Sequence, residues 1–246
     1  MEINVFNFVL LFLIIILSQT VETTTGFGST VIALSLGALI FPLKELVVLL
    51  VIIGGLQSLW IVVRYYKHIQ WRILLGRIVP LCGLGLPIGI YFFDYLCGPQ
   101  LKLFFGIFVV LVATAELINL YRTKGATRDL PLPMGIALLL AGGIIHGIFA
   151  TGGPLIVYYT SRRLEEKAGF RATLSMLWLV LNSSLAINFM LSHSIHRAGI
   201  ALAGELLPAL FLGIFFGEIL HRKVNEFTFR IVVQCILLLT GIFLLI

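Results

Sequence analysis

The sequence contains few charged residues for its length. Lysine, arginine, aspartate and glutamate make up 11% of its 246 residues, hydrophobic residues make up 60%, and the mean hydropathy is +1.10. A soluble domain of this length would carry about 25% charged residues. Because so little polar surface is available to cover a water-soluble globule, lipid must be the solvent for much of the chain. The composition therefore excludes a soluble protein and predicts an all-α integral membrane protein.

Other absences narrow the function. The three cysteines form no CxxC pair and have no histidine nearby at ligand spacing, so the sequence indicates neither a disulfide framework nor a metal site. The net charge of +6 comes from short basic clusters between apolar runs, a pattern that argues against nucleic-acid binding. The chain has no phosphate-binding loop, and no nucleophile-elbow pattern surrounds Ser29 or His146. We therefore expect neither an enzyme nor a cofactor.

Apolar runs of about 20 residues, the length that crosses a bilayer, recur along the chain. Six are visible directly, at roughly 46–64, 74–94, 101–121, 171–191, 198–219 and 228–246. Two further apolar regions, 3–41 and 133–161, are interrupted by polar and glycine-rich residues, and we expect a two-armed hairpin in each. In the second region both arms look too short to cross. The total is about eight to ten membrane segments, which predicts a multi-pass protein of the plasma membrane.

Basic residues orient these segments, because cytoplasmic loops of membrane proteins are enriched in lysine and arginine. Clusters of them lie at 64–77, 122–128, 162–171 and 222–230. Placing all four in the cytoplasm makes every full span alternate and puts both termini outside. Each interrupted region must then enter and leave on one side of the membrane, the first from outside and the second from inside.

Matching residues recur at offsets of 124 to 128, about half the chain length. The matched pairs are Gly28 with Gly152, Gln57-Ser58 with Asn182-Ser183, Pro80 with Pro208, Gly85 with Gly213, and Gly89 with Gly217. Chance alignment of helices rich in glycine and leucine is the alternative. The charge pattern independently favours two inverted repeats, 1–121 and 133–246, joined by a cytoplasmic linker at 122–132. Inverted repeats around broken helices are typical of secondary transporters.

The two interruptions contain the candidate binding site. Irregular backbone at membrane depth is tolerated only inside protein or against a water-filled cavity. Each break leads into a helix N-terminus, near residues 30 and 154, where free N–H groups and the helix dipole attract an anion. Close packing of helices at the glycines is the alternative. The residues of the breaks that we expect to bind the substrate are Thr24, Thr25, Gly26, Phe27, Gly28, Ser29, Thr151, Gly152, Gly153 and Pro154.

Polar residues inside the spans extend this candidate site. Gln57, Asn182 and Ser183 are expected to contact the substrate, with hydrogen bonding between helices as the alternative. His146 and Glu22 are the titratable residues nearest the breaks and are the candidates for proton coupling. The alternative for His146 is a neutral imidazole bonded to a backbone carbonyl that the break has freed. The alternative for Glu22 is a place at the outer mouth.

The glycine segments Gly26-Phe27-Gly28-Ser29 and 147–156 together resemble the paired motifs of the sulfite exporter TauE/SafE family. The resemblance covers nearly the whole chain, although Ser29 and Thr30 depart from the glycine run of the first motif. It implies a transporter that moves a small organic or sulfur-containing anion, usually outward and often with protons. A passive anion channel, a non-transporting scaffold or receptor, and a homo-oligomer remain alternatives that the sequence leaves open.

Overall fold

The computed structural model describes residues 4–122, 130–164, 166–223 and 226–245, and the regular structure in these ranges is helical throughout. Among the described residues, six helices are long and apolar enough to cross a membrane. The number is seven if the helices Arg197–Glu205 and Leu207–Leu220, which meet at an angle of 42°, count as one span. The predicted all-α membrane protein is therefore confirmed.

The N-terminal half begins with a capped helix. The Asn4 side chain accepts a hydrogen bond of 2.8 Å from the backbone N–H of Asn7 at the start of α1. A π-helical turn at Leu74–Ile78 joins α4 and α5 into one apolar span. The helices of this half are α1 (Val5–Thr25), α2 (Ser29–Gly37), α3 (Leu43–Tyr65), α4 (Trp71–Ile73), α5 (Val79–Tyr95) and α6 (Gly98–Arg122).

The C-terminal half follows the same order of a hairpin and three further apolar segments. The helices are α7 (Leu132–Phe149), α8 (Gly153–Thr160), α9 (Lys167–Leu191), α10 (Arg197–Glu205), α11 (Leu207–Lys223) and α12 (Glu226–Leu245). The short α10 and the longer α11 form the bent span.

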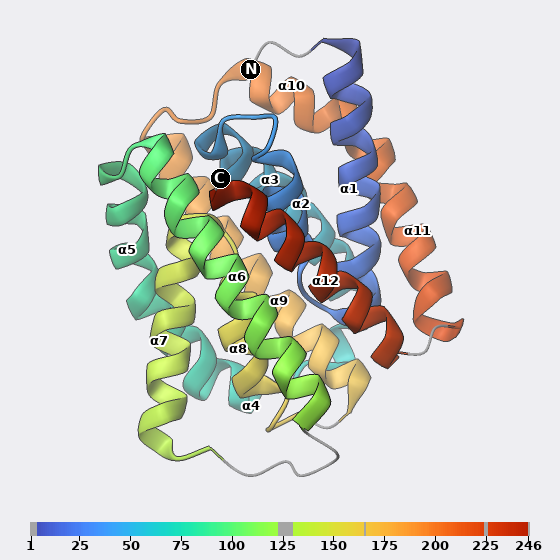
Figure 1. Ribbon diagram of the computed structural model, residues 1–246. Helices are drawn as coiled ribbons and strands as arrows, with labels where there is room; N and C mark the ends of the chain where they lie inside the picture. Colours follow the sequence, from blue (N-terminus) through green and yellow to red (C-terminus); the bar gives the residue numbers. More distant parts are fainter. Residues whose placement is uncertain (1–3, 123–129, 165, 224–225, 246) are drawn as a thin grey trace.

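Both hairpins have one long arm and one short arm. α1 has 21 residues and α7 has 18, whereas α2 has 9 and α8 has 8. At about 1.5 Å per residue the short arms reach about 12–14 Å, less than half of a hydrocarbon core about 30 Å thick. The prediction of two short arms in 133–161 was therefore wrong, because α7 is long enough to cross. The long arms α1 and α7 start from opposite ends of the molecule (Figure 1).

Turns that carry basic clusters lie together at one end of the molecule. The backbone N–H of Gln70 donates to Thr173 Oγ1 at 2.9 Å, and His68 Nδ1 lies 3.7 Å from Glu166 Oε1. The turn after α3 therefore contacts the start of α9, as the predicted alternation of spans requires. The linker cluster lies largely outside the described residues, which omit 123–129. The side of the membrane that this end faces stays a prediction.

The closest helix packing connects the two halves. α1 packs on α11, α5 on α7, α3 on α9 and α6 on α12. A Cβ atom on Gly85 or Gly89 of α5 would overlap the backbone of α7, and one on Gly213 or Gly217 of α11 would overlap α1. Glycines at repeat-matched positions thus make matched contacts. This exchange of partners is expected of two halves related by a two-fold axis, and it supports the repeat, which stays a proposal.

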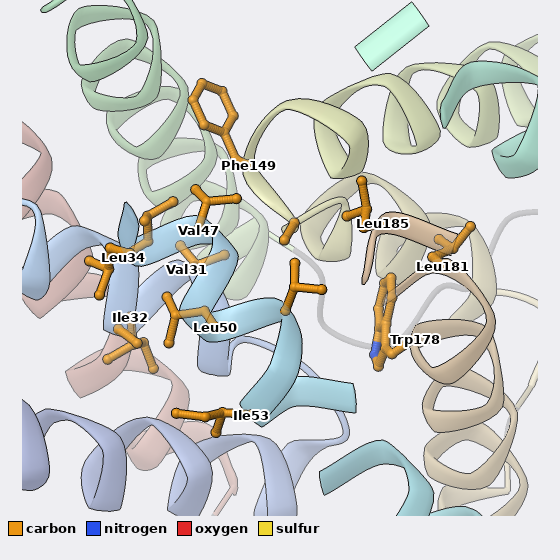
Figure 2. Packing of buried hydrophobic residues seen from close by; sticks show 14 of the residues in the cluster. Val31, Ile32, Leu34, Val47, Leu50, Ile53, Phe149, Trp178, Leu181 and Leu185 are labelled. Atoms are coloured by element: carbon orange, nitrogen blue, oxygen red, sulfur yellow. The ribbon is translucent and has the colours of Figure 1, made fainter. Parts of the chain in front are cut away.

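The short helix α2 is buried in the apolar core. Figure 2 shows Val31, Ile32 and Leu34 of α2 beside side chains of α3, with Phe149 and residues of α9 nearby. Val31 and Ile32 are almost fully buried, and Leu34 is completely so. A helix that is apolar on all sides is stable only when it is surrounded by protein or lipid. The core therefore holds the N-terminus of α2 in a fixed position inside the molecule.

Candidate functional site

The two breaks in the hairpins meet in the interior. A Cβ atom added to Gly153 would lie 4.0 Å from Phe27 Cβ. Between the breaks is a cavity of about 20 Å³, called the central cavity below, with room for about one water molecule. Its lining residues are Glu22, Gly28, Thr30, Gly54, His146, Ala150, Thr151, Gly153, Trp178 and Asn182. The structure thus brings together the first and second breaks, as the shared-site hypothesis requires.

The first break depends on two glycines in the left-handed conformation. Gly26 has φ 89° and Gly28 has φ 101°, a region that side chains with a Cβ atom rarely adopt. The Gly26 N–H donates to the carbonyl of Glu22 at 2.6 Å, and the Gly26 carbonyl accepts from Trp178 Nε1 at 3.2 Å. The hydroxyl of Thr25 donates back to the Val21 carbonyl at 2.9 Å. The Thr25 hydroxyl also lies 2.8 Å from the Phe27 carbonyl in the break. The Thr24 hydroxyl donates to the Thr20 carbonyl at 2.7 Å and lies 3.3 Å from the Gly217 carbonyl of α11, so both threonine hydroxyls bond backbone groups.

The N-terminus of α2 is occupied by the carboxylate of Glu22. Glu22 Oε2 accepts one hydrogen bond from the backbone N–H of Ser29 at 3.1 Å and a second from the Ser29 hydroxyl. The Glu22 side chain is 5% exposed and lies in the interior, so the alternative that placed it at the outer mouth is wrong. A carboxylate of the chain itself therefore lies where the sequence predicted the substrate anion.

The second break ends its long helix as the first does, but Gly152, which matches Gly28, has φ -77° and the side chains differ. Ala150, with φ 53°, takes the left-handed position that matches Gly26, and its N–H donates to the His146 carbonyl at 2.7 Å. The Gly152 N–H donates to His146 Nδ1 at 3.4 Å. A ring nitrogen can accept only without a proton, so this imidazole is neutral and has its proton on Nε2. The contact differs from the alternative in which the imidazole bonds a freed carbonyl, because an amide N–H is its partner here.

His146 is held in a fixed orientation on one side of the central cavity. Its ring stacks on that of Trp178, with centroids 5.7 Å apart and planes inclined by 8°. The side chain is 1% exposed, and its Nε2 atom interacts with the Asn182 side chain without a hydrogen bond of normal length among the described residues. A buried donor without a full hydrogen bond loses about 1–3 kcal/mol relative to a satisfied one. His146 therefore presents an N–H group that an anion could satisfy.

The two glycines at the start of α8 have different surroundings. A Cβ atom on Gly152 would overlap the backbone carbonyl of Gly142 in α7, so Gly152 permits close packing within the hairpin. A Cβ atom on Gly153 would meet only Phe27, at van der Waals distance. Within the described chain no side chain caps this helix, and Pro154 in its first turn has no N–H. The N-terminus of α8 is thus open, in contrast with that of α2.

The polar residues predicted within the spans separate into two groups. Asn182 lines the central cavity, and its Oδ1 atom makes no hydrogen bond of normal length among the described residues. Gln57 instead donates from Nε2 to the Gln19 carbonyl at 3.1 Å and to Thr23 Oγ1 at 2.9 Å, which bonds α3 to α1. Ser183 is exposed on the outer surface of α9. The structure therefore brings only Asn182 of this set to the cavity.

A larger cavity of about 510 Å³, called the side groove below, adjoins the breaks. Gly28 lines both the side groove and the central cavity, and Pro154 also lines the side groove. Its other lining residues include Ser161 and Phe170, beside the turns that carry basic residues, and the half-buried Glu116 of α6. The side groove thus extends from this end of the molecule to the helix breaks, and its volume is typical of a ligand pocket.

Sequence reasoning missed two residues near the breaks. Trp178 binds the first break and stacks on the histidine of the second. Arg171, which we grouped with a basic loop, is 5% exposed, and its Nη2 donates to Glu218 Oε1 at 2.7 Å. A Cβ atom on Gly26 would lie 3.3 Å from Arg171 Cα. A tryptophan in an apolar run, or an arginine at its end, carries no sequence signal that separates these contacts from lipid or interface positions.

Comparison with known proteins identifies the family. The model of the family described as sulfite exporter TauE/SafE matches residues 11–244. The chain belongs to this family. The chain is also similar to a curated protein from Comamonas testosteroni that is named probable inner membrane transporter protein TsaS. The two are 25% identical over 184 residues, which cover 72% of this chain and 73% of the relative. No solved structure matches the chain.

Family membership confirms the resemblance that the glycine motifs indicated. The TauE/SafE chain is a multi-pass transporter of the plasma membrane, with the lipid bilayer and a small anionic substrate as its partners. Large apolar side chains are exposed along its helices, including Val5, Leu13, Leu84 and Phe215. These side chains form the surface that faces hydrocarbon.

Proposed function

We propose that this TauE/SafE transporter exports a small anion, such as sulfite, an organosulfonate or a related organic acid, from the central cavity by alternating access. One observation carries the proposal: the open N-terminus of α8 shares the central cavity with two buried polar atoms that make no hydrogen bond of normal length among the described residues, although their side chains interact with each other. These atoms are His146 Nε2 and Asn182 Oδ1. The amide of Asn182 presents its NH₂ group instead of Oδ1 after a half-turn about its last bond.

An anion in this position needs no lysine or arginine. In the first turn of α8, the backbone N–H groups of Gly153 and Leu155 can donate to an anion. Pro154 has no N–H group, and the N–H of Ile156 donates to the Gly152 carbonyl. A helix N-terminus stabilises a partly buried anion by up to about 2 kcal/mol. Each hydrogen bond to a charged group adds about 1.5–3 kcal/mol. These donors, with His146 Nε2, are a reasonable replacement for part of the anion's hydration.

The size of the central cavity favours a carrier over a passive channel. At about 20 Å³ it is much smaller than a sulfite ion, so the two hairpins must separate for an anion to enter. The side groove supplies the path from one end, and Gly28 lies between the two spaces. In the orientation predicted from charge, that end faces the cytoplasm, as export requires. A carrier alternates between such a path and its counterpart on the other side of the bilayer.

Proton coupling belongs to the same proposal. Glu22 and His146 are separated by 124 positions, the offset that relates Gly28 to Gly152, and both line the central cavity. A titratable group at the substrate site links the binding of protons to the binding of the anion. We assign the proton to one of these two residues.

Flux in proteoliposomes tests the proposed function. The purified protein is reconstituted, and uptake is measured for sulfite, methanesulfonate, acetate and a neutral solute of similar size. We expect saturable uptake of at least one anion, no uptake of the neutral solute, and a response to an imposed pH gradient. Anion flux that rises without saturation and ignores the gradient would identify a passive channel. The absence of flux for every anion would contradict transport of this substrate class.

A further inference from the structure

The charge at the N-terminus of α2 has a consequence for the transported anion. The N-terminus of a helix attracts one negative group, and that of α2 already holds the Glu22 carboxylate through Ser29. Gly28, the residue before α2, lines the central cavity together with His146, whose Nε2 is buried without a hydrogen bond of normal length in the described chain. Two negative charges in so small a space repel each other strongly, because little solvent separates them.

We infer that the Glu22 carboxylate competes with the transported anion, filling the α2 half of the central cavity until it takes up a proton. This inference rests on the proposed function and adds the way in which the proton acts. The carboxylate accepts a proton from water, becomes a neutral carboxylic acid and releases the Ser29 N–H and hydroxyl. The anion then lies between two helix N-termini instead of one. Loss of the proton on the far side restores the bonds to Ser29 and expels the anion.

The surroundings of Glu22 make it the group that changes charge. His146 of α7 faces it across the central cavity and is neutral, because its Nδ1 accepts from Gly152. Arg171 of α9 lies behind Gly26 and is paired with Glu218 of α11, which also accepts from the Tyr65 hydroxyl. Glu116, the carboxylate of α6, lines the side groove and not the central cavity. From α3, the neighbouring Gln57 does not titrate.

The inference predicts the sense of coupling. One proton enters with each anion, so the two cross the membrane together. Acid on the side that holds the anion therefore accelerates flux, and alkali on that side slows it. Above the pH at which Glu22 loses its proton, the affinity for the anion falls by up to about tenfold per pH unit. A carrier in which Glu22 only capped α2 would show neither effect.

Binding of methanesulfonate to the purified protein tests this inference. Methanesulfonate stays ionised between about pH 5 and pH 9, whereas acetate and bisulfite titrate near or within that range. In the wild type we expect the dissociation constant to rise with pH. In Glu22→Gln it should stay constant with pH, and at alkaline pH it should be at least tenfold lower than that of the wild type. Glu205→Gln, the same change at an exposed position, is the control and should keep the wild-type pH profile.

Any other outcome contradicts the inference. A Glu22→Gln variant that binds methanesulfonate with the wild-type pH dependence, or that binds none at alkaline pH, overturns it. If Glu116→Gln, and not Glu22→Gln, abolishes the pH dependence of binding, the titrating group lies in the side groove, and this result also overturns the inference. A measurement on the wild type alone does not depend on whether a variant folds. When methanesulfonate is added to unbuffered protein at alkaline pH, the protein should take up about one proton from the solution per anion bound. No proton uptake overturns the inference, while sulfite flux in proteoliposomes would leave the proposed function standing.

Discussion

The two helix breaks end their long helices in the same way but have opposite chemistry. In each, a left-handed residue ends a long helix by donating its N–H to the carbonyl four residues earlier: Gly26 to Glu22, and Ala150 to His146. A short helix then begins within three residues. At the first break the Glu22 side chain closes the N-terminus of α2. At the second break the His146 side chain leaves the N-terminus of α8 open. Two helix ends of the same kind with different side chains give one cavity two unequal ends.

The largest effect is expected at the two glycines that open α8. Gly152→Ala places a methyl group on the Gly142 carbonyl, and overpacking of this kind costs about 1–3 kcal/mol or more, so we expect a lower melting temperature and loss of monodisperse protein. Gly153→Val has space and should fold, but its branched side chain covers the N–H groups of the first turn. We expect its anion flux to fall by at least about tenfold.

The control for this pair is Gly83→Val, because a Cβ atom on Gly83 of α5 has nothing within 4 Å. Melting temperature, gel filtration in detergent and proteoliposome flux are measured on all three variants. Wild-type flux in Gly153→Val would show that the open N-terminus of α8 does not hold the anion. Normal folding of Gly152→Ala would show that the hairpin tolerates a wider separation of α7 and α8.

A smaller effect is expected at His146, the residue that matches Glu22. His146→Gln keeps a polar side chain but loses both the stacking on Trp178 and the bond from Gly152. We expect methanesulfonate binding to weaken by about tenfold or more, the value of one hydrogen bond to a charged group. The pH dependence of binding should remain, because Glu22 is intact. If it disappears, His146 carries the proton and the two breaks have exchanged the roles given to them here.

The smallest effect is expected at the threonines. Thr151 lines the central cavity, so Thr151→Ala should raise the dissociation constant by about twofold to tenfold, which corresponds to about 0.5–1.5 kcal/mol. Thr25 bonds its own helix, so Thr25→Ala should leave the dissociation constant unchanged. Isothermal titration of both variants with methanesulfonate gives the comparison. Equal effects of the two changes would mean that these hydroxyls act through the backbone and not on the anion.

The spans were predictable because each depends on one simple quantity, the length of an apolar run. The predicted span 46–64 is α3 (Leu43–Tyr65), and 171–191 is α9 (Lys167–Leu191). The arms of the hairpins were less predictable. α2 ends at Gly37, well before the predicted 41, because a turn and Pro42 lead directly into α3. Hydropathy is equally high on both sides of such a turn, so it cannot locate the end of a short helix.

The candidate site was predictable at the backbone and not at the side chains. Gly28 and Gly152 mark positions where a side chain is excluded or a close approach is needed, and that requirement is visible in sequence. Gln57 and Asn182 hold matched positions, yet the first bonds α1 and the second lines the cavity. The direction that an amide faces depends on its neighbours in space. For the same reason the bond from Ser29 to Glu22 could not be anticipated.

The packing of α1 on α11 sets an order of events during synthesis. α1 is made well before α11, and its buried polar residues include Gln19 and Thr20, the second of which donates to the Gly213 carbonyl of α11 at 3.2 Å. Nearly two hundred residues separate these partners in the chain. Until α11 leaves the ribosome, the polar side of α1 must be shielded from hydrocarbon by the insertion machinery or by a temporary neighbour. A helix that is made early is thus among the last to reach its final contacts, and a nascent chain that stops before α11 lacks the partner for this side of α1.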